Sequence, residues 1–171
     1  MNVELWRLSL LNGRRASWAG GYFFLVNQDN KFINGPILTP TGEIKVVVSS
    51  AAKAETGGLS INMKEANMLR TTLNKMGYQQ PATPIQVSNS TACGIANDNI
   101  KIQQSKAIDM QFYWIRDRVH QKQFNVYWRL GTTNLADYVT KHHTSTHHQL
   151  MRPIYLHQAQ YFATLRKTFW Y

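Results

Sequence analysis

Residues 85–94 read IQVSNSTACG and decide the fold class, because a strand gives way to a helix within this short stretch. Apolar and polar residues alternate through Ile85 and Val87, as in a short strand. The polar run SNST then offers helix-capping side chains ahead of the small-residue run ACGIAN. α/β proteins place their chemistry where a strand ends against the start of a helix. The stretch therefore predicts an α/β fold with a site at Ser88, although it carries no charged residue.

The composition narrows the class of protein. The chain has 171 residues, about the size of one domain, and its 43% hydrophobic content is that of a packed globular protein. Nineteen Lys and Arg residues against nine Asp and Glu give a net charge of +10. This charge makes nucleic acid the leading partner class, with a merely basic soluble surface as the alternative. The single cysteine, Cys93, excludes an internal disulfide and a cysteine-rich zinc site.

The N-terminal charge order and the apolar runs bear on localisation. No apolar run approaches the roughly 20 residues that span a bilayer, so no membrane partner is expected. Glu4 precedes the first apolar stretch and Arg14 and Arg15 follow it, the reverse of a secretory signal. We therefore expect an intracellular protein, and the sequence leaves cytoplasm and nucleus open.

Turn signals and hydrophobic spacing predict the order of elements. β-rich runs at residues 22–26, 32–38 and 44–48 predict an antiparallel meander of three strands. Apolar residues at helical spacing predict a helix over residues 50–76, with Gly77 as its stop. The later predicted elements are a strand at 85–87, helices at 90–96 and around 108–119, a strand at 124–130, and a helix at 134–143 capped by Asn134.

The acidic residues are few enough to consider singly as metal ligands. Glu55 falls in the first turns of the long predicted helix, and Asp137 falls in the helix after the last predicted strand. By position alone, each fits a solvated surface charge better than a metal ligand. An enzyme that cuts polynucleotides with two divalent ions would need several carboxylates at one sheet edge.

Basic and aromatic residues are interleaved over residues 106–129, a mixture that suits phosphate contacts and base stacking. The spacing of the aromatics assigns most of them to the core. The candidate nucleic-acid-binding residues are Lys106, Arg116, Arg118, Lys122, Arg129 and Lys141.

Four histidines form the pattern HHxxxHH: His142, His143, His147 and His148. His143 and His147 are four residues apart, the spacing at which two ligands share one helical face. No third ligand of matching kind is near in sequence, and TSTHH continues a helix poorly. A structural or phosphate-facing role is therefore favoured over zinc binding.

Five segments resemble, in order and spacing, the ribonuclease H region of copia-type retrotransposon polyproteins. They are VVVSSAAKAET, IQVSNSTACGIAN, KAIDMQFYWIRDRV, NLADYVTKHH and RPIYL, and the match runs over residues 19–156. The resemblance implies an α/β, ribonuclease H-like fold: a mixed five-stranded sheet, beginning with three antiparallel strands, with helices on both faces. It also implies cleavage of the RNA strand of RNA:DNA hybrids by four carboxylates that hold two Mg²⁺ ions.

The carboxylates of that family are only partly matched. Its helix glutamate falls on Glu55 and its final aspartate on Asp137, whereas the Asp of its TDN or CDN segment falls on Ser88. Its first carboxylate belongs to a strand that matches residues 5–10, which hold no Asp, although Glu4 lies close by. The resemblance thus implies metal ligands at Glu55 and Asp137 and a site without hydrolytic activity. The alternatives are an active ribonuclease H that uses Glu4 and a noncatalytic basic nucleic-acid-binding module.

The resemblance also suggests a domain organisation. Residues 1–18 form a poorly matched first-strand region, residues 19–143 the ribonuclease H-like domain, and residues 144–171 a C-terminal extension. In the family this domain is normally joined to a reverse transcriptase that this sequence does not contain. We therefore expect a fragment or remnant of a polyprotein, with RNA:DNA hybrid or other nucleic acid as its partner.

Overall fold

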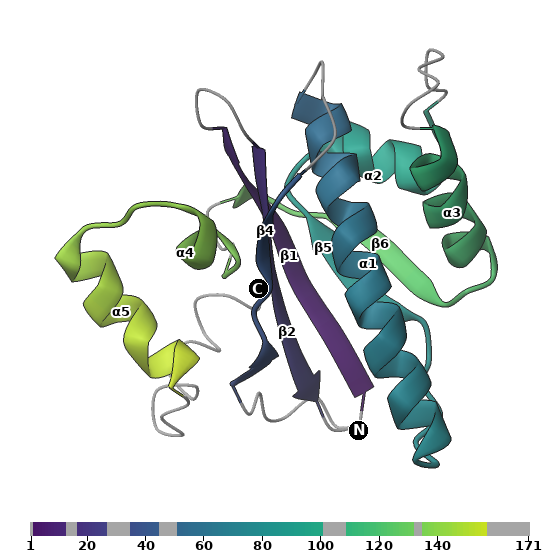
Figure 1. The fold of residues 1–171 in the computed structure, drawn as a ribbon, viewed down its shortest axis with the longest axis horizontal. Coiled ribbons are helices and arrows are strands. Elements are labelled where there is room, and N and C mark those ends of the chain that lie inside the picture. Colours follow the sequence, from purple (N-terminus) through teal and green to yellow (C-terminus); the bar gives the residue numbers. More distant parts are fainter. Residues whose placement is uncertain are drawn as a thin grey trace.

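A computed structural model describes residues 2–12, 17–26, 35–44, 51–100, 109–131 and 135–156 (Figure 1). In this part of the chain, six strands form one sheet in the order β3-β2-β1-β5-β6, with β4 also paired to β2. The predicted count of five is not confirmed, because two short strands share the edge beside β2. The strands are β1 (Asn2–Asn12), β2 (Ser17–Val26), β3 (Pro36–Leu38), β4 (Thr41–Glu43), β5 (Thr83–Val87) and β6 (Phe124–Trp128).

The strand directions confirm that the sheet is mixed. β1 and β2 are antiparallel, whereas β1 with β5 and β5 with β6 are parallel. The parallel strands all end at one side of the sheet, which we call the carboxyl edge, where Val87 pairs with Trp128. β2 begins at the same edge, since Trp18 pairs with Leu11 near the end of β1. Side chains of several elements can therefore gather at this edge.

Helices cover both faces of the sheet, as expected (Figure 1). One face carries α1 (Ala51–Lys75), α2 (Ser90–Ala96) and α3 (Asp109–His120), and the other carries α4 (Asp137–Thr140) and α5 (Ser145–Tyr155). Successive side chains of β2 point to opposite faces of the sheet, so β2 contributes to the hydrophobic core on each face. Phe23 packs in the core with α1, whereas Tyr22 and Phe24 pack with Met151 and Ile154 of α5.

Local signals explain the best-predicted boundaries. The Gly77 and Tyr78 backbone N–H groups donate to the Asn74 and Leu73 carbonyls, which closes α1 in a Schellman motif. Gly77 has a φ of +90°, a conformation that glycine adopts without strain. Asn89 caps α2 by accepting a hydrogen bond from the Ala92 N–H at 3.0 Å. The predicted range of α2, residues 90–96, is confirmed.

Other boundaries differ from the prediction. Of the third predicted strand, residues 44–48, the structure describes only Ile44, which directly follows β4; residues 45–48 lie outside the described part. The predicted helix at 134–143 is reduced to α4, which ends because Lys141 adopts an extended backbone. Its predicted cap, Asn134, also lies outside the described residues. α5, in the predicted C-terminal extension, was not predicted as a helix. Among the described helices, none combines the length and apolar content that crossing a membrane requires.

Candidate functional site

Glu55 and Ser88 meet at the carboxyl edge. Glu55 lies in the second turn of α1, and Ser88 directly follows the last residue of β5. The Ser88 hydroxyl donates a 2.8 Å hydrogen bond to Glu55 Oε1. Only 4% of Glu55 is exposed, so this carboxyl is a buried group and not the solvated charge that its sequence position alone favoured. The Trp128 indole N–H donates to the Ser88 carbonyl at 2.9 Å and fixes the chain there.

Asp137 lies close enough to Glu55 for their charges to interact. Burial raises the pKa of Glu55, and hydrogen bonds from Ser88 oppose that rise. The charge of Asp137 raises the same pKa further, while the charge of Lys141 lowers it. The structure therefore brings together the three predicted positions Glu55, Ser88 and Asp137, and it adds Lys141 as a fourth member.

Lys141 neutralises Asp137 within the site. Its Nζ lies 2.6 Å from Asp137 Oδ2, in an ion pair that joins the first turn of α4 to the residue after its end. The Asp137 side chain is 21% exposed and that of Lys141 is 44% exposed, so the pair is partly shielded from water. The four-residue spacing of Asp137 and Lys141 is the sequence signal that could have predicted this ion pair.

These donors do not fit a pair of Mg²⁺ ions. Mg²⁺ prefers carboxylate oxygens in an octahedral set, and a two-ion site needs several carboxylates. In this site the Glu55 carboxyl accepts a hydroxyl hydrogen bond, and that of Asp137 is paired with an ammonium group. Within the described residues, no three His, Cys, Asp or Glu side chains are grouped closely enough to hold a metal ion.

The strand register separates Glu4 from this site. Leu5 of β1 lies beside Ile85 of β5. Ser88 is three residues beyond Ile85, and Glu4 is one residue before Leu5. Glu4 and Ser88 are therefore offset by four residues along the strand direction. Four residues of strand span roughly 13 Å. The two ions of a catalytic pair lie only about 4 Å apart, so this offset separates Glu4 from the site.

Two of the predicted nucleic-acid-binding residues make contacts within the protein. Arg116 donates to the Ile95 and Ile100 carbonyls and forms a 2.8 Å ion pair with Asp98, so it holds α3 to the chain after α2. Arg118 lies 5.6 Å from the centroid of the Trp114 ring.

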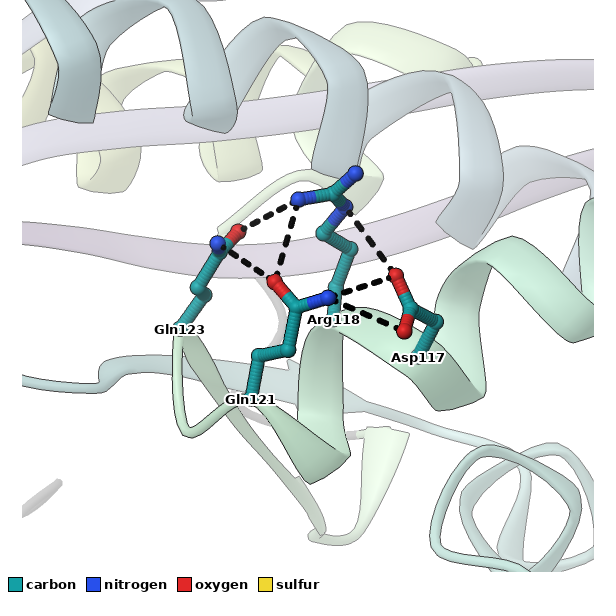
Figure 2. Close-up of polar contacts among 4 residues, drawn as sticks. All are labelled: Asp117, Arg118, Gln121 and Gln123. Atoms are coloured by element: carbon teal, nitrogen blue, oxygen red, sulfur yellow. Dashed lines mark hydrogen bonds and ion pairs between the residues drawn. The ribbon is translucent and has the colours of Figure 1, made fainter.

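The Arg118 guanidinium also belongs to a network of polar side chains (Figure 2). It donates to the Gln121 and Gln123 side-chain oxygens at 3.3 and 3.4 Å, and it lies 3.8 Å from Asp117. Gln121 in turn donates to both carboxylate oxygens of Asp117. The network joins the end of α3 to the turn before β6, which indicates a structural role.

The other predicted basic residues lie at different edges of the sheet. Arg129 is exposed at the carboxyl edge, where its backbone N–H donates to the Val87 carbonyl. Lys122 is exposed in the turn that leads into β6, at the opposite edge. Lys106 lies outside the described residues. The predicted basic residues that the structure describes are therefore spread over opposite edges of the sheet and do not form one surface.

The histidines cluster, but without the shared helical face that zinc binding by His143 and His147 would use. His143 and His147 do not share a helical face, because Thr144 is extended and caps α5 after His143. Their rings nevertheless stack with centroids 4.2 Å apart, and the His148 Nδ1 lies 2.9 Å from the Tyr138 hydroxyl. His143 Nε2 lies 3.0 Å from the Asp137 carbonyl oxygen, which ties the cluster to α4. These contacts support the structural role.

The raised pKa of Glu55 predicts a pH-dependent stability. A carboxyl with a raised pKa in the folded state stabilises the fold most below its ordinary value of 4.5, and this contribution is lost as pH rises through the folded-state pKa. We expect Glu55→Gln to be more stable than the wild type at pH 8, by about 1 kcal/mol or more, because it removes a buried charge. Urea unfolding between pH 4 and pH 8 measures the difference.

Glu65→Gln is the matched control for this prediction, since Glu65 lies on the same helix and is only half-buried. The free-energy difference between wild type and Glu55→Gln should shrink toward acid pH, whereas Glu65→Gln should not stabilise the fold at pH 8. A Glu55→Gln difference that stays the same from pH 4 to pH 8 would contradict the placement of Glu55.

The fold is similar to that of a solved ribonuclease H domain. The N-terminal ribonuclease H domain of Rv2228c from Mycobacterium tuberculosis, solved as a fusion protein with maltose-binding protein, matches with a TM-score of 0.56. The match covers 81% of this chain and 90% of that chain at 11% sequence identity, a level at which the likeness concerns the fold alone. No protein-family model matches the sequence, and no curated protein matches it. The chain therefore has a ribonuclease H-like fold.

Proposed function

We propose that this chain is a ribonuclease H-like domain derived from a copia-type retrotransposon polyprotein, and that it binds RNA:DNA hybrid or a related nucleic acid without cutting it. The observation that carries the proposal is the hydrogen bond between Ser88 and the buried Glu55. A hydroxyl lies where the family would supply a metal-binding carboxylate. Glu55 and Asp137 are the remaining ligands of the family's set.

The loss of hydrolysis follows from the charges at the site. Lys141 already neutralises Asp137, and the Glu55 carboxyl accepts a hydrogen bond from Ser88, so both carboxyls are engaged by groups of the protein itself. The alternative of an active enzyme that uses Glu4 is disfavoured by the strand register, which sets Glu4 roughly 13 Å from the level of Ser88.

Binding without cleavage is supported by the charge of the chain and by exposed cations. The net charge of +10 attracts the phosphate backbone. Among the predicted residues, Lys122, Arg129 and Lys141 are exposed, and Arg129 and Lys141 lie at or beside the carboxyl edge. We propose that these two lysines and Arg129 contact phosphates, whereas Arg116 and Arg118 are held by contacts within the protein.

Hybrid binding should depend steeply on salt. Each phosphate contact adds about 0.9 to the slope of log affinity against log salt for duplex DNA, so the three proposed contacts weaken binding roughly 40-fold between 50 and 200 mM salt. Arg129→Ala should reduce the slope by about one, because it removes one such contact. Fluorescence anisotropy with a labelled RNA:DNA hybrid measures both quantities.

The control for this titration is Lys64→Ala, which removes an exposed lysine from the middle of α1 and should leave the slope unchanged. Equal slopes for Arg129→Ala and Lys64→Ala would remove Arg129 from the binding surface. Undetectable hybrid binding by the wild type, or affinity that ignores salt, would overturn the proposed function and leave an inert remnant.

A further inference from the structure

A small cavity opens beside the candidate site, on the α4 face of the sheet. It encloses about 190 Å³ and is lined by Trp18, Thr41, Val139, Thr140, Lys141 and His142. Sites for drug-sized ligands enclose roughly 300–1,000 Å³, so this cavity fits a single ring system with its substituents. The cavity shares Lys141 with the ion pair to Asp137.

Gly20 brings the two walls of the cavity together. A Cβ at this position would overlap Thr140 Cγ2 and lie 3.2 Å from Val139 Cγ2, so α4 lies directly on the backbone of β2. The next turn of the chain therefore carries Lys141 and His142 to the start of β2, where Trp18 lies. The cavity is built from elements that are far apart in the sequence.

The lining combines an aromatic surface with groups that recognise anions. Trp18 is 43% exposed, which leaves part of the residue open to a ligand. Lys141 lines the cavity, its side chain is 44% exposed, and its ammonium group has three donors, so it can bind an anion in addition to Asp137. A base that stacks on an aromatic ring and a phosphate beside a lysine are the usual contacts of an unpaired nucleotide.

We propose that this cavity holds one unstacked nucleotide of a bound nucleic acid, with its base against the Trp18 indole and its phosphate beside Lys141. The proposal rests on the nucleic-acid binding proposed above and adds where an unpaired end of the nucleic acid is held. A fully paired blunt hybrid offers no such nucleotide, whereas a hybrid with a short single-stranded overhang does.

The test compares the affinities of these two hybrids by fluorescence anisotropy at one salt concentration. We expect the wild type to bind the overhang hybrid about tenfold more tightly, since stacking of one base contributes an effect of that size. Trp18→Ala should bind both hybrids as the wild type binds the blunt one. Thr41→Phe, which fills the cavity from the neighbouring strand β4 and leaves Trp18 in place, should give the same loss.

Tyr113→Ala is the matched control, because it removes an aromatic ring that is 69% exposed on α3, across the sheet from the cavity. It should keep the full preference for the overhang. A preference that survives in both Trp18→Ala and Thr41→Phe, or a wild type with equal affinity for the two hybrids, would overturn the nucleotide site and leave hybrid binding intact. Failure of the wild type to bind either hybrid would instead overturn the proposed function.

Discussion

The purified chain should leave an RNA:DNA hybrid uncut in millimolar Mg²⁺, at a rate at least about a thousandfold below that of an active ribonuclease H. A metal pair contributes several kcal/mol to such a reaction, and each 1.4 kcal/mol is about tenfold in rate. We expect that contribution to be lost, because Ser88 donates to Glu55 and Lys141 is paired with Asp137. Gel analysis of an end-labelled RNA strand measures the rate.

Ser88→Asp alone should not restore cleavage. The new carboxylate would face Glu55 across a 2.8 Å contact, so we expect repulsion and lower stability at neutral pH instead of a working metal site. Residues 5–10, where the proposed family would place its first carboxylate, still hold no Asp, and Lys141 still neutralises Asp137. Ser88→Ala serves as the control, because it removes the hydroxyl without adding charge.

Two results would contradict this prediction. Wild-type cleavage that disappears in Glu55→Ala would show that the remaining carboxylates suffice. Cleavage that appears in Ser88→Asp and not in Ser88→Ala would show that another acid, such as Glu4, takes the place of the missing first-strand Asp. The first result would favour the active alternative over the binding module, and the second would contradict the expectation that Ser88→Asp alone is insufficient.

The parts of the fold that were predictable depend on local chemistry. Asn89 caps α2 through its own side chain, and Gly77 ends α1 through its backbone, so both boundaries are encoded within a few residues. α5 was not predicted, because a proline within the segment is usually a turn signal. Pro153 in fact lies inside α5, near its end, and the helix is held by tertiary packing of Met151 and Ile154 against β2.

The site was predictable as a set of positions but not as a set of interactions. The motif order pointed to Glu55, Ser88 and Asp137, and the structure brings these three together. Sequence separation hides which element lies beside which, so Trp18 gave no signal that it would lie next to Lys141. The aromatic and basic run around Arg116 suggested phosphate contacts and base stacking. In the structure, the Arg116 guanidinium instead binds the chain after α2 and holds α3 against it.

Arg70→Ala should cause a large loss of stability, about 3 kcal/mol, or roughly 10 °C in Tm. Arg70 is 7% exposed and donates to the Gln80 and Pro81 carbonyls and to the Thr83 hydroxyl. Its guanidinium also lies 5.5 Å from the centroid of the Phe124 ring. Truncation to Ala would leave buried acceptors unpaired and open a cavity against β6.

The geometry of the guanidinium, more than its charge, should account for this loss. Arg70 joins α1 to the loop before β5, and Thr83 begins the strand that ends at Val87, so the contact fixes where that strand starts. Arg70→Lys keeps the charge but cannot reach acceptors on both sides, and it should lose more than half of the same free energy. Lys64→Ala, on the exposed side of α1, should change stability by less than about 0.5 kcal/mol. Urea unfolding of the three variants measures these differences, and a full rescue by Arg70→Lys would show that charge alone holds the loop.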